Sequence, residues 1–146
     1  MSPEYDRVLV PTDGNDGVEQ ALDHAVRLAD DHGATVHALS VIDRRLTRAA
    51  DDAREDVLDR LRDRSERAVA AVAERVEDAG LAVESAVREG VPDKEIVEYA
   101  ADVGIDVVVI GTYGRTGRDR LANLGSVTER VVENADRPVF VVHIDE

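Results

Sequence analysis

The fold class follows from the stretch Val107-Val108-Val109-Ile110-Gly111-Thr112-Tyr113-Gly114-Arg115-Thr116-Gly117. Its first four residues are apolar and β-branched, which is typical of a strand buried on both faces of a sheet. Three glycines follow, and glycine lets backbone N–H groups approach a bound anion closely. A helix-like pattern then begins near Gly125-Ser126-Val127-Thr128. A strand, a glycine-rich loop and a helix N-terminus together favour phosphate binding, because free amides and the helix dipole attract negative charge.

The charge around this stretch differs from that of the whole chain. The 146 residues carry a formal net charge of −14. Between Gly111 and Ser126, however, Arg115, Arg118 and Arg120 face a single acid, Asp119. A basic island in an acidic chain favours an anionic ligand bound locally. The alternative is a solvated loop whose arginines pair with nearby carboxylates.

Strand and helix patterns alternate on both sides of this stretch. Strands are predicted at residues 5–10, 35–42, 81–87, 106–110 and 139–144. Four helices are predicted: from a capping box at 16–19 to Gly33, at about 52–79, from Pro92 onward, and at 126–134. In the third of these helices, the residues expected to face inward are Ile96, Val97, Ala100 and Ala101. Residues 43–51 are expected to be a loop. This order predicts one α/β domain over residues 1–146, an open parallel sheet with helices on both faces.

Ligands of open parallel sheets bind beyond the carboxyl ends of the strands, where the strand order reverses. The first predicted strand ends in Pro11-Thr12-Asp13, and the fourth ends in the glycine-rich loop. If these strands are neighbours, Asp13 and the loop line one crevice. Asp13 would accept hydrogen bonds from a base or ribose, or hold Mg²⁺; the alternative is a plain helix N-cap. Ser126 is likewise an N-cap, a phosphate contact, or both.

Composition excludes several classes of protein. The 19 Asp and 13 Glu residues against one lysine, Lys94, indicate a protein adapted to a salt-rich cytosol. The acidic balance argues against nucleic acid as a partner. No apolar run reaches the ~20 residues of a membrane helix, and no signal peptide is visible, so a cytoplasmic location is expected. Cysteine is absent, and neither Gly-x-x-x-x-Gly-Lys-[Ser/Thr] nor Gly-x-Gly-x-x-Gly occurs.

These residues resemble the universal stress protein family over nearly the whole chain. The similarity is carried by Val8-Leu9-Val10-Pro11-Thr12-Asp13-Gly14, Gly90-Val91-Pro92, residues 109–117, and Gly125-Ser126-Val127-Thr128-Glu129-Arg130-Val131. The resemblance implies a Rossmann-like sheet in the order 3-2-1-4-5, ATP or another adenine nucleotide as ligand, and a homodimer formed through Val139–Ile144. It also implies the contacts: Asp13 and the backbone of Val41 at adenine and ribose, and Gly111, Gly114, Gly125, Ser126, Val127 and Thr128 at ribose and phosphates.

The chain departs from the family pattern in one spacing. Ten residues, 115–124, separate Gly114 from Gly125, where the ATP-binding pattern has nine. The leading hypothesis is a regulatory, ATP-binding stress-response dimer. One alternative is a slow ATPase or nucleotidyl-transfer enzyme that uses Asp13 and Mg²⁺. Another is a nucleotide-free dimer that acts through an unidentified protein partner.

Overall fold

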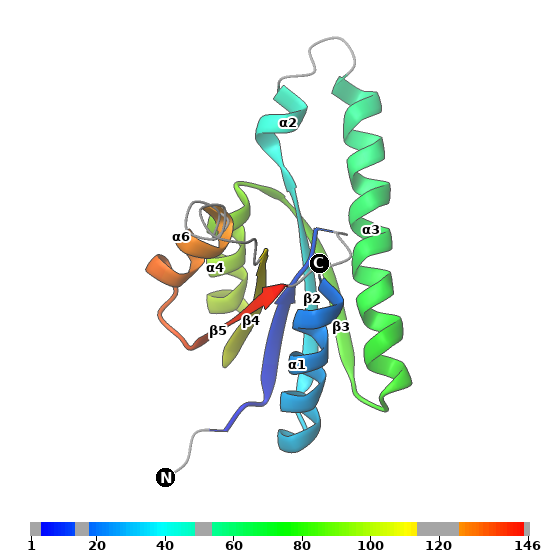
Figure 1. Ribbon diagram of the computed structural model, residues 1–146. Helices are drawn as coiled ribbons and strands as arrows, with labels where there is room; N and C mark the ends of the chain where they lie inside the picture. The colour runs from blue at the N-terminus through cyan, green and yellow to red at the C-terminus, as the bar shows by residue number, and fades with distance from the viewer. Residues whose placement is uncertain (1–3, 14–17, 49–53, 114–125, 145–146) are drawn as a thin grey trace.

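The computed structural model describes residues 4–13, 18–48, 54–113 and 126–144. Strands and helices alternate along the chain (Figure 1). The strands are β1 (Arg7–Pro11), β2 (Thr35–Asp43), β3 (Val83–Gly90), β4 (Val107–Tyr113) and β5 (Val139–Ile144). The helices are α1 (Val18–His32), α2 (Arg44–Arg48), α3 (Arg54–Asp78), α4 (Pro92–Val103) and α6 (Ser126–Asn134).

The five strands form one parallel sheet in the order β3-β2-β1-β4-β5, which confirms the predicted fold class and strand order. Strands β1 and β4 are neighbours, with Val8 opposite Val107 and Leu9 opposite Val108. The strand order reverses at this pair. The ends of β1 and β4 therefore lie beside the crevice where open parallel sheets bind ligands.

Helices cover both faces of the sheet. Val8 and Val10 pack into a buried cluster with apolar residues of α1 and α3, whereas Leu9 packs into a second cluster with residues of α4 and α6. Successive strand residues point to opposite faces, so a continuous apolar strand supplies both clusters. Gly33 and Gly80 follow α1 and α3 with φ angles of 66° and 78°, which confirms them as the predicted helix stops.

The prediction of a loop at 43–51 is wrong at its start. Asp43 is the last residue of β2, and α2 begins directly after it. Two contacts explain the difference. The parallel ladder continues to the pair Asp43–Gly90, and the Asp43 carboxylate accepts a hydrogen bond of 3.0 Å from the backbone N–H of Arg45. The aspartate thereby ends the strand and caps the first turn of the helix.

Strands β3 and β4 extend further than predicted. Strand β3 runs to Gly90 because β2 continues beside it, and β4 runs to Tyr113 because β5 pairs with it up to Ile144. Gly111 therefore lies inside β4 rather than in the loop after it. In α4, Ala101 was expected to face inward but is exposed. Tyr99 is buried in its place.

Candidate functional site

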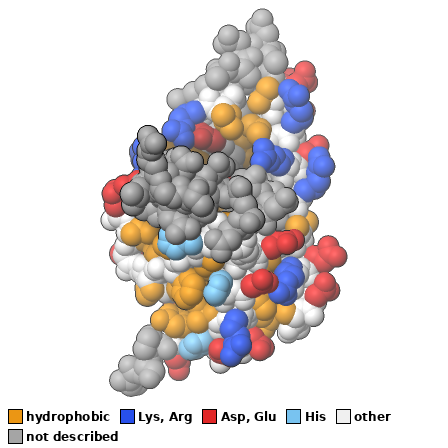
Figure 2. Space-filling view, in the orientation of Figure 1, with side chains coloured by type: hydrophobic (Ala, Val, Ile, Leu, Met, Phe, Trp, Pro, Cys, Tyr) orange, Lys and Arg blue, Asp and Glu red, His pale blue; other side chains and the backbone are white. Residues whose placement is uncertain are grey.

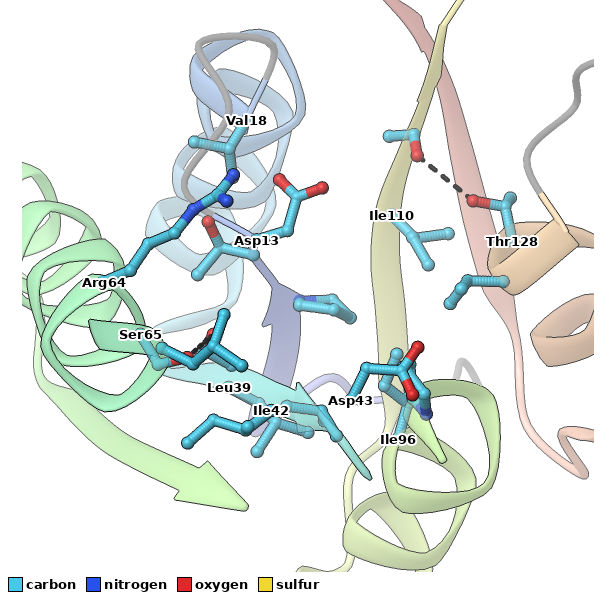
Figure 3. Close-up of a pocket in the computed structure, with 18 of the residues that line it drawn as sticks. Asp13, Val18, Leu39, Ile42, Asp43, Arg64, Ser65, Ile96, Ile110 and Thr128 are labelled. Carbon is cyan, nitrogen blue, oxygen red and sulfur yellow. Dashed lines mark hydrogen bonds between the residues drawn. The ribbon is translucent and has the colours of Figure 1, made fainter. Parts of the chain in front are cut away.

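A cavity of about 500 Å³ opens at the carboxyl ends of β1, β2 and β4 (Figure 3). Side chains from both helix layers contribute to its wall. The predicted site residues that line it are Pro11, Thr12, Asp13, Val41, Gly111, Val127 and Thr128. Two segments that are about 100 residues apart in the sequence, 11–13 and 111–112, thus meet at one site. The prediction that Asp13 shares a crevice with the glycine-rich stretch is confirmed for Gly111 and Thr112, while residues 114–117 lie outside the described residues.

The end of β1 brings Asp13 to the rim of the cavity. The backbone N–H of Thr12 donates a hydrogen bond of 2.8 Å to the carbonyl of Leu39, which extends the pairing with β2 by one residue. Thr12 is buried, while Asp13 is exposed. Figure 3 shows the carboxylate of Asp13 beside Val18 and Arg64, at the open side of the cavity. The site therefore has one carboxylate positioned by the end of a central strand.

Strand β2 runs past the end of β1. The last pair between the two strands is Pro11–Leu39, whereas β2 continues to Asp43 along β3. Within the described residues, no strand pairs with Val41–Asp43 on the side of β1. Val41, Ile42 and Asp43 all line the cavity, so this backbone edge lies beside it. Val41 is the predicted contact on this edge and lines the cavity.

Gly111 has a packing role that the sequence did not reveal. A Cβ atom at this position would lie 2.5 Å from Cδ1 of Ile144 and 3.5 Å from Cβ of Ala21. Ile144 is itself buried, so the added atom would force the core to shift. The contact between β4, β5 and α1 thus disfavours a side chain at residue 111, independently of any ligand.

The first turn of α6 closes the far side of the cavity. The hydroxyl of Thr128 donates a hydrogen bond of 3.2 Å to the carbonyl of Gly111, and Thr128 is buried. This bond fixes the helix start against β4 (Figure 3). Ser126 is the first residue of α6. Gly114, Arg115 and Gly125 fall in the part of the chain that the structure does not describe.

Asp43 lines the cavity and was missed by the sequence analysis. Its carboxylate accepts hydrogen bonds from the Arg45 side chain at 2.8 Å and 3.0 Å. These bonds lower the pKa of Asp43 below its ordinary value, against the opposing effect of burial. The charge of Asp43 is therefore largely compensated by Arg45. Its position at the end of a predicted strand was the available signal.

Helix α3 supplies a further wall that was not predicted. The hydroxyls of Ser40 on β2 and Ser65 on α3 form a hydrogen bond of 3.0 Å, and both residues are buried. This contact holds α3 against β2 and brings Arg64 and Leu61 to the cavity. Ser65 lies between Leu61 and Ala68 on the apolar side of α3. A polar residue on this apolar side was the overlooked signal.

Among residues 4–13, 18–48, 54–113 and 126–144, no three His, Asp or Glu side chains cluster as metal ligands would. Over the same ranges, no helix combines the length and the apolar character needed to cross a bilayer.

Comparison with known proteins identifies the family. The model of the universal stress protein family matches residues 4–143. The chain belongs to the universal stress protein family. The universal stress protein MJ0531 of Methanocaldococcus jannaschii is 37% identical over 140 residues, which cover 94% of this chain and 82% of that protein.

Solved structures of universal stress proteins share the fold. The structure of protein MJ0577 of M. jannaschii superimposes with a TM-score of 0.84 at 29% identity, over 99% of each chain. A crystal structure of a universal stress protein in complex with cAMP has a TM-score of 0.75 at 27% identity, over 98% of this chain and 100% of that one. The Rossmann-like architecture is thus that of the family.

Proposed function

We propose that this universal stress protein is a single regulatory domain that binds ATP or another adenine nucleotide in the cavity beyond β1, β2 and β4. The observation that carries the proposal is the cavity itself. It lies at the strand-order reversal and brings Asp13, the free edge of β2 and the start of α6 to one space. A pocket of a few hundred Å³ with few polar groups is the usual form of a small-molecule site.

Each part of an adenine nucleotide has a matching part of the cavity. The unpaired backbone edge at Val41 suits the hydrogen-bonding edge of adenine. Asp13 suits ribose hydroxyls or the base. The free amides of the first turn of α6, beginning at Ser126 and Val127, suit phosphate oxygens because the helix dipole adds positive potential there. Gly114, Arg115 and Gly125 stay predicted contacts of the same phosphates.

A related protein supports the choice of ligand class. The universal stress protein crystallised with cAMP shares the fold at 27% identity over nearly the whole chain. An adenine nucleotide is therefore the first ligand to test. Mg²⁺ would reach this site together with a nucleotide, held by phosphate oxygens and the Asp13 carboxylate, because Mg²⁺ is usually bound by one or two carboxylates plus phosphates.

The direct test is to identify what the purified protein contains and binds. We expect mass spectrometry of the denatured protein to release an adenine nucleotide, and calorimetry of the emptied protein to detect ATP binding at molar salt. If neither ATP, ADP, AMP nor cAMP binds to folded protein, the proposal is wrong. Phosphate release above background that is lost in Asp13→Ala would instead favour an enzyme.

We further propose that two copies associate through β5. This strand lies at the sheet edge, and Phe140 on it is 44% exposed. An edge strand with unpaired backbone groups and an exposed aromatic residue is suited to pairing with a second strand. Figure 2 shows hydrophobic side chains gathered on the face that carries β5 and α1. We expect Phe140→Glu to convert the dimer to a monomer in light scattering; a monomeric wild-type protein would refute the assembly.

The acidic composition supports a cytoplasm rich in salt as the working environment. The formal net charge is −14, and Figure 2 shows acidic and basic side chains interspersed on the side where α3 lies. At molar salt the screening length is about 3 Å, so repulsion between carboxylates is largely removed. We expect the melting temperature to rise markedly between dilute buffer and molar KCl. An unchanged melting temperature would count against salt adaptation.

A further inference from the structure

Few charged side chains line the cavity, and they differ in whether an opposite charge pairs with them. Among the described residues of its wall, three side chains are charged: Asp13, Asp43 and Arg64. Asp43 is bound by Arg45 through two side-chain hydrogen bonds. Arg64 forms no hydrogen bond or ion pair with any residue that the structure describes, and it is the one cation among those lining residues. The cavity of a strongly acidic protein thus contains a guanidinium that pairs with no carboxylate among the described residues.

The position of Arg64 is set by its helix. Ser65, the next residue, is buried and hydrogen-bonded to Ser40 on β2. Arg64 therefore stands at the border between the buried and exposed sides of α3. Figure 3 shows its side chain extending from α3 toward Asp13 and Val18, with α6 across the cavity. Other arginines of this helix pair with carboxylates: Arg62 with Glu89 and Arg75 with Asp23.

We propose that Arg64 binds a phosphate group of the nucleotide and so makes the cavity selective for nucleotides over nucleosides; this inference rests on the proposed function. A polyphosphate brings several negative charges into a cavity that already holds Asp13. The amides of α6 approach such a chain from one side, and Arg64 approaches it from the opposite side. Guanidinium is well suited to this task because its planar donors match two phosphate oxygens at once.

Selectivity between ATP and adenosine distinguishes a phosphate contact by Arg64 from a role in shaping the cavity. A contact to phosphate stabilises bound ATP but contributes nothing to bound adenosine. A residue that only orients Asp13 or shapes the cavity would affect both ligands equally. The effect of Arg64 should therefore grow from adenosine through AMP to ATP. It should also shrink as salt is raised, because exposed charge pairs are screened.

The test compares Arg64→Gln, Arg64→Lys and the control Arg67→Gln by calorimetry with adenosine, AMP and ATP. Arg67 lies on the same helix, is exposed and does not line the cavity. We expect Arg64→Gln to weaken ATP binding about tenfold, as for loss of a charge-assisted hydrogen bond, and to change adenosine binding less than about twofold. Arg64→Lys should retain part of the affinity for ATP, and Arg67→Gln all of it.

Folding of each variant is verified by its melting temperature, which should not change because Arg64 has no hydrogen-bond or ion-pair partner among the described residues. Unchanged ATP affinity in Arg64→Gln, an equal loss for adenosine and ATP, or an equal loss in Arg67→Gln would each overturn the role of Arg64 while leaving nucleotide binding intact. A wild-type protein that binds none of the three ligands would overturn the proposed function, and this inference with it.

Discussion

The two ends of the sheet are built differently. At the amino end, side chains satisfy backbone groups: the Asp106 carboxylate accepts hydrogen bonds from the N–H groups of Asp6 at 2.8 Å and Arg7 at 3.0 Å. Arg137 donates to the carbonyls of Ala100 at 2.7 Å and Ile105 at 2.6 Å. At the carboxyl end, a cavity of about 500 Å³ lies between strands that stop at different levels.

This difference separates stability from binding. Backbone N–H and C=O groups need hydrogen-bond partners, and at the amino end the side chains of Asp106 and Arg137 supply them. At the carboxyl end, no described strand pairs with the end of β2 on the side of β1, and the proposed ligand would bind this edge and the start of α6. Substitutions at the amino end should therefore lower the free energy of unfolding without changing affinity per folded molecule. Substitutions at the rim of the cavity should weaken ligand affinity with little change in the free energy of unfolding.

The largest effect is expected from Asp13→Ala at the carboxyl end. Loss of a charged hydrogen-bonding group should weaken ATP binding by about 1.5–3 kcal/mol, or roughly 10- to 100-fold. The free energy of unfolding should change by no more than about 1 kcal/mol, because Asp13 is exposed. Calorimetry and urea denaturation measure the two quantities. Asp30→Ala, an exposed carboxylate on α1, is the control. Equal ATP affinity of Asp13→Ala and Asp30→Ala would show that Asp13 does not contact the nucleotide.

A smaller effect with the opposite distribution is expected from Asp106→Ala at the amino end. The N–H groups of Asp6 and Arg7 lose their shared acceptor, which should lower the free energy of unfolding by about 2 kcal/mol. ATP affinity, measured under conditions where the variant is fully folded, should stay within about twofold of wild type. Asp106→Asn keeps one acceptor oxygen and should be less damaging. A large loss of affinity in Asp106→Ala would contradict the separation of the two ends.

Substitution of Gly111 tests whether one residue contributes both to stability and to ATP affinity. Gly111→Ala places Cβ against Cδ1 of Ile144 and should destabilise the fold by about 1 kcal/mol. Ile144→Val removes that Cδ1 atom, so the double variant should be more stable than the sum of the two single changes predicts. We also expect Gly111→Ala to weaken ATP binding. If the double variant regains both stability and ATP affinity, Gly111 acts through packing alone. If affinity stays low, the ligand also needs the bare backbone at residue 111.

The sequence was sufficient for the features that depend on local pattern. Continuous apolar runs such as 107–110 identified buried parallel strands, and the residues after the first and fourth strands indicated where the cavity lies. These signals succeed because hydrophobic periodicity and glycine positions reflect backbone constraints directly.

The missed features depend on tertiary contacts. Asp43 extends β2 because Gly90 of β3 pairs with it, and no local pattern contains that pairing. Arg64 is one of many arginines in a charged helix. The hydrogen bond between Ser40 and Ser65, together with the packing of α3 on the sheet, turns its side of α3 toward the cavity. Tyr99 is buried instead of Ala101 because it meets a buried histidine, His37, on β2.

His37 lies between the two ends, in the middle of the sheet. It is 1% exposed, and its Nδ1 atom is 2.9 Å from the hydroxyl of Tyr99. Its Nε2 atom lies 3.5 Å from Oε2 of Glu84. Burial lowers the pKa of His37 below 6.5, assisted by Arg7 and opposed by Glu84. Burial therefore favours the neutral imidazole in the fold, and Arg88 lies 4.9 Å over the ring of its partner Tyr99.

The smallest expected effect is a pH dependence of stability that neither end of the sheet controls. Because the pKa of His37 is lower in the folded state than in the unfolded state, the unfolded chain binds more protons below about pH 6.5. The free energy of unfolding should therefore fall as the pH decreases from 7.5 to 5.5. In His37→Phe combined with Tyr99→Phe, which leaves neither partner of the hydrogen bond unsatisfied, this decrease should be shallower. Urea denaturation at both pH values measures it, and an identical decrease in the two proteins would show that His37 does not cause it.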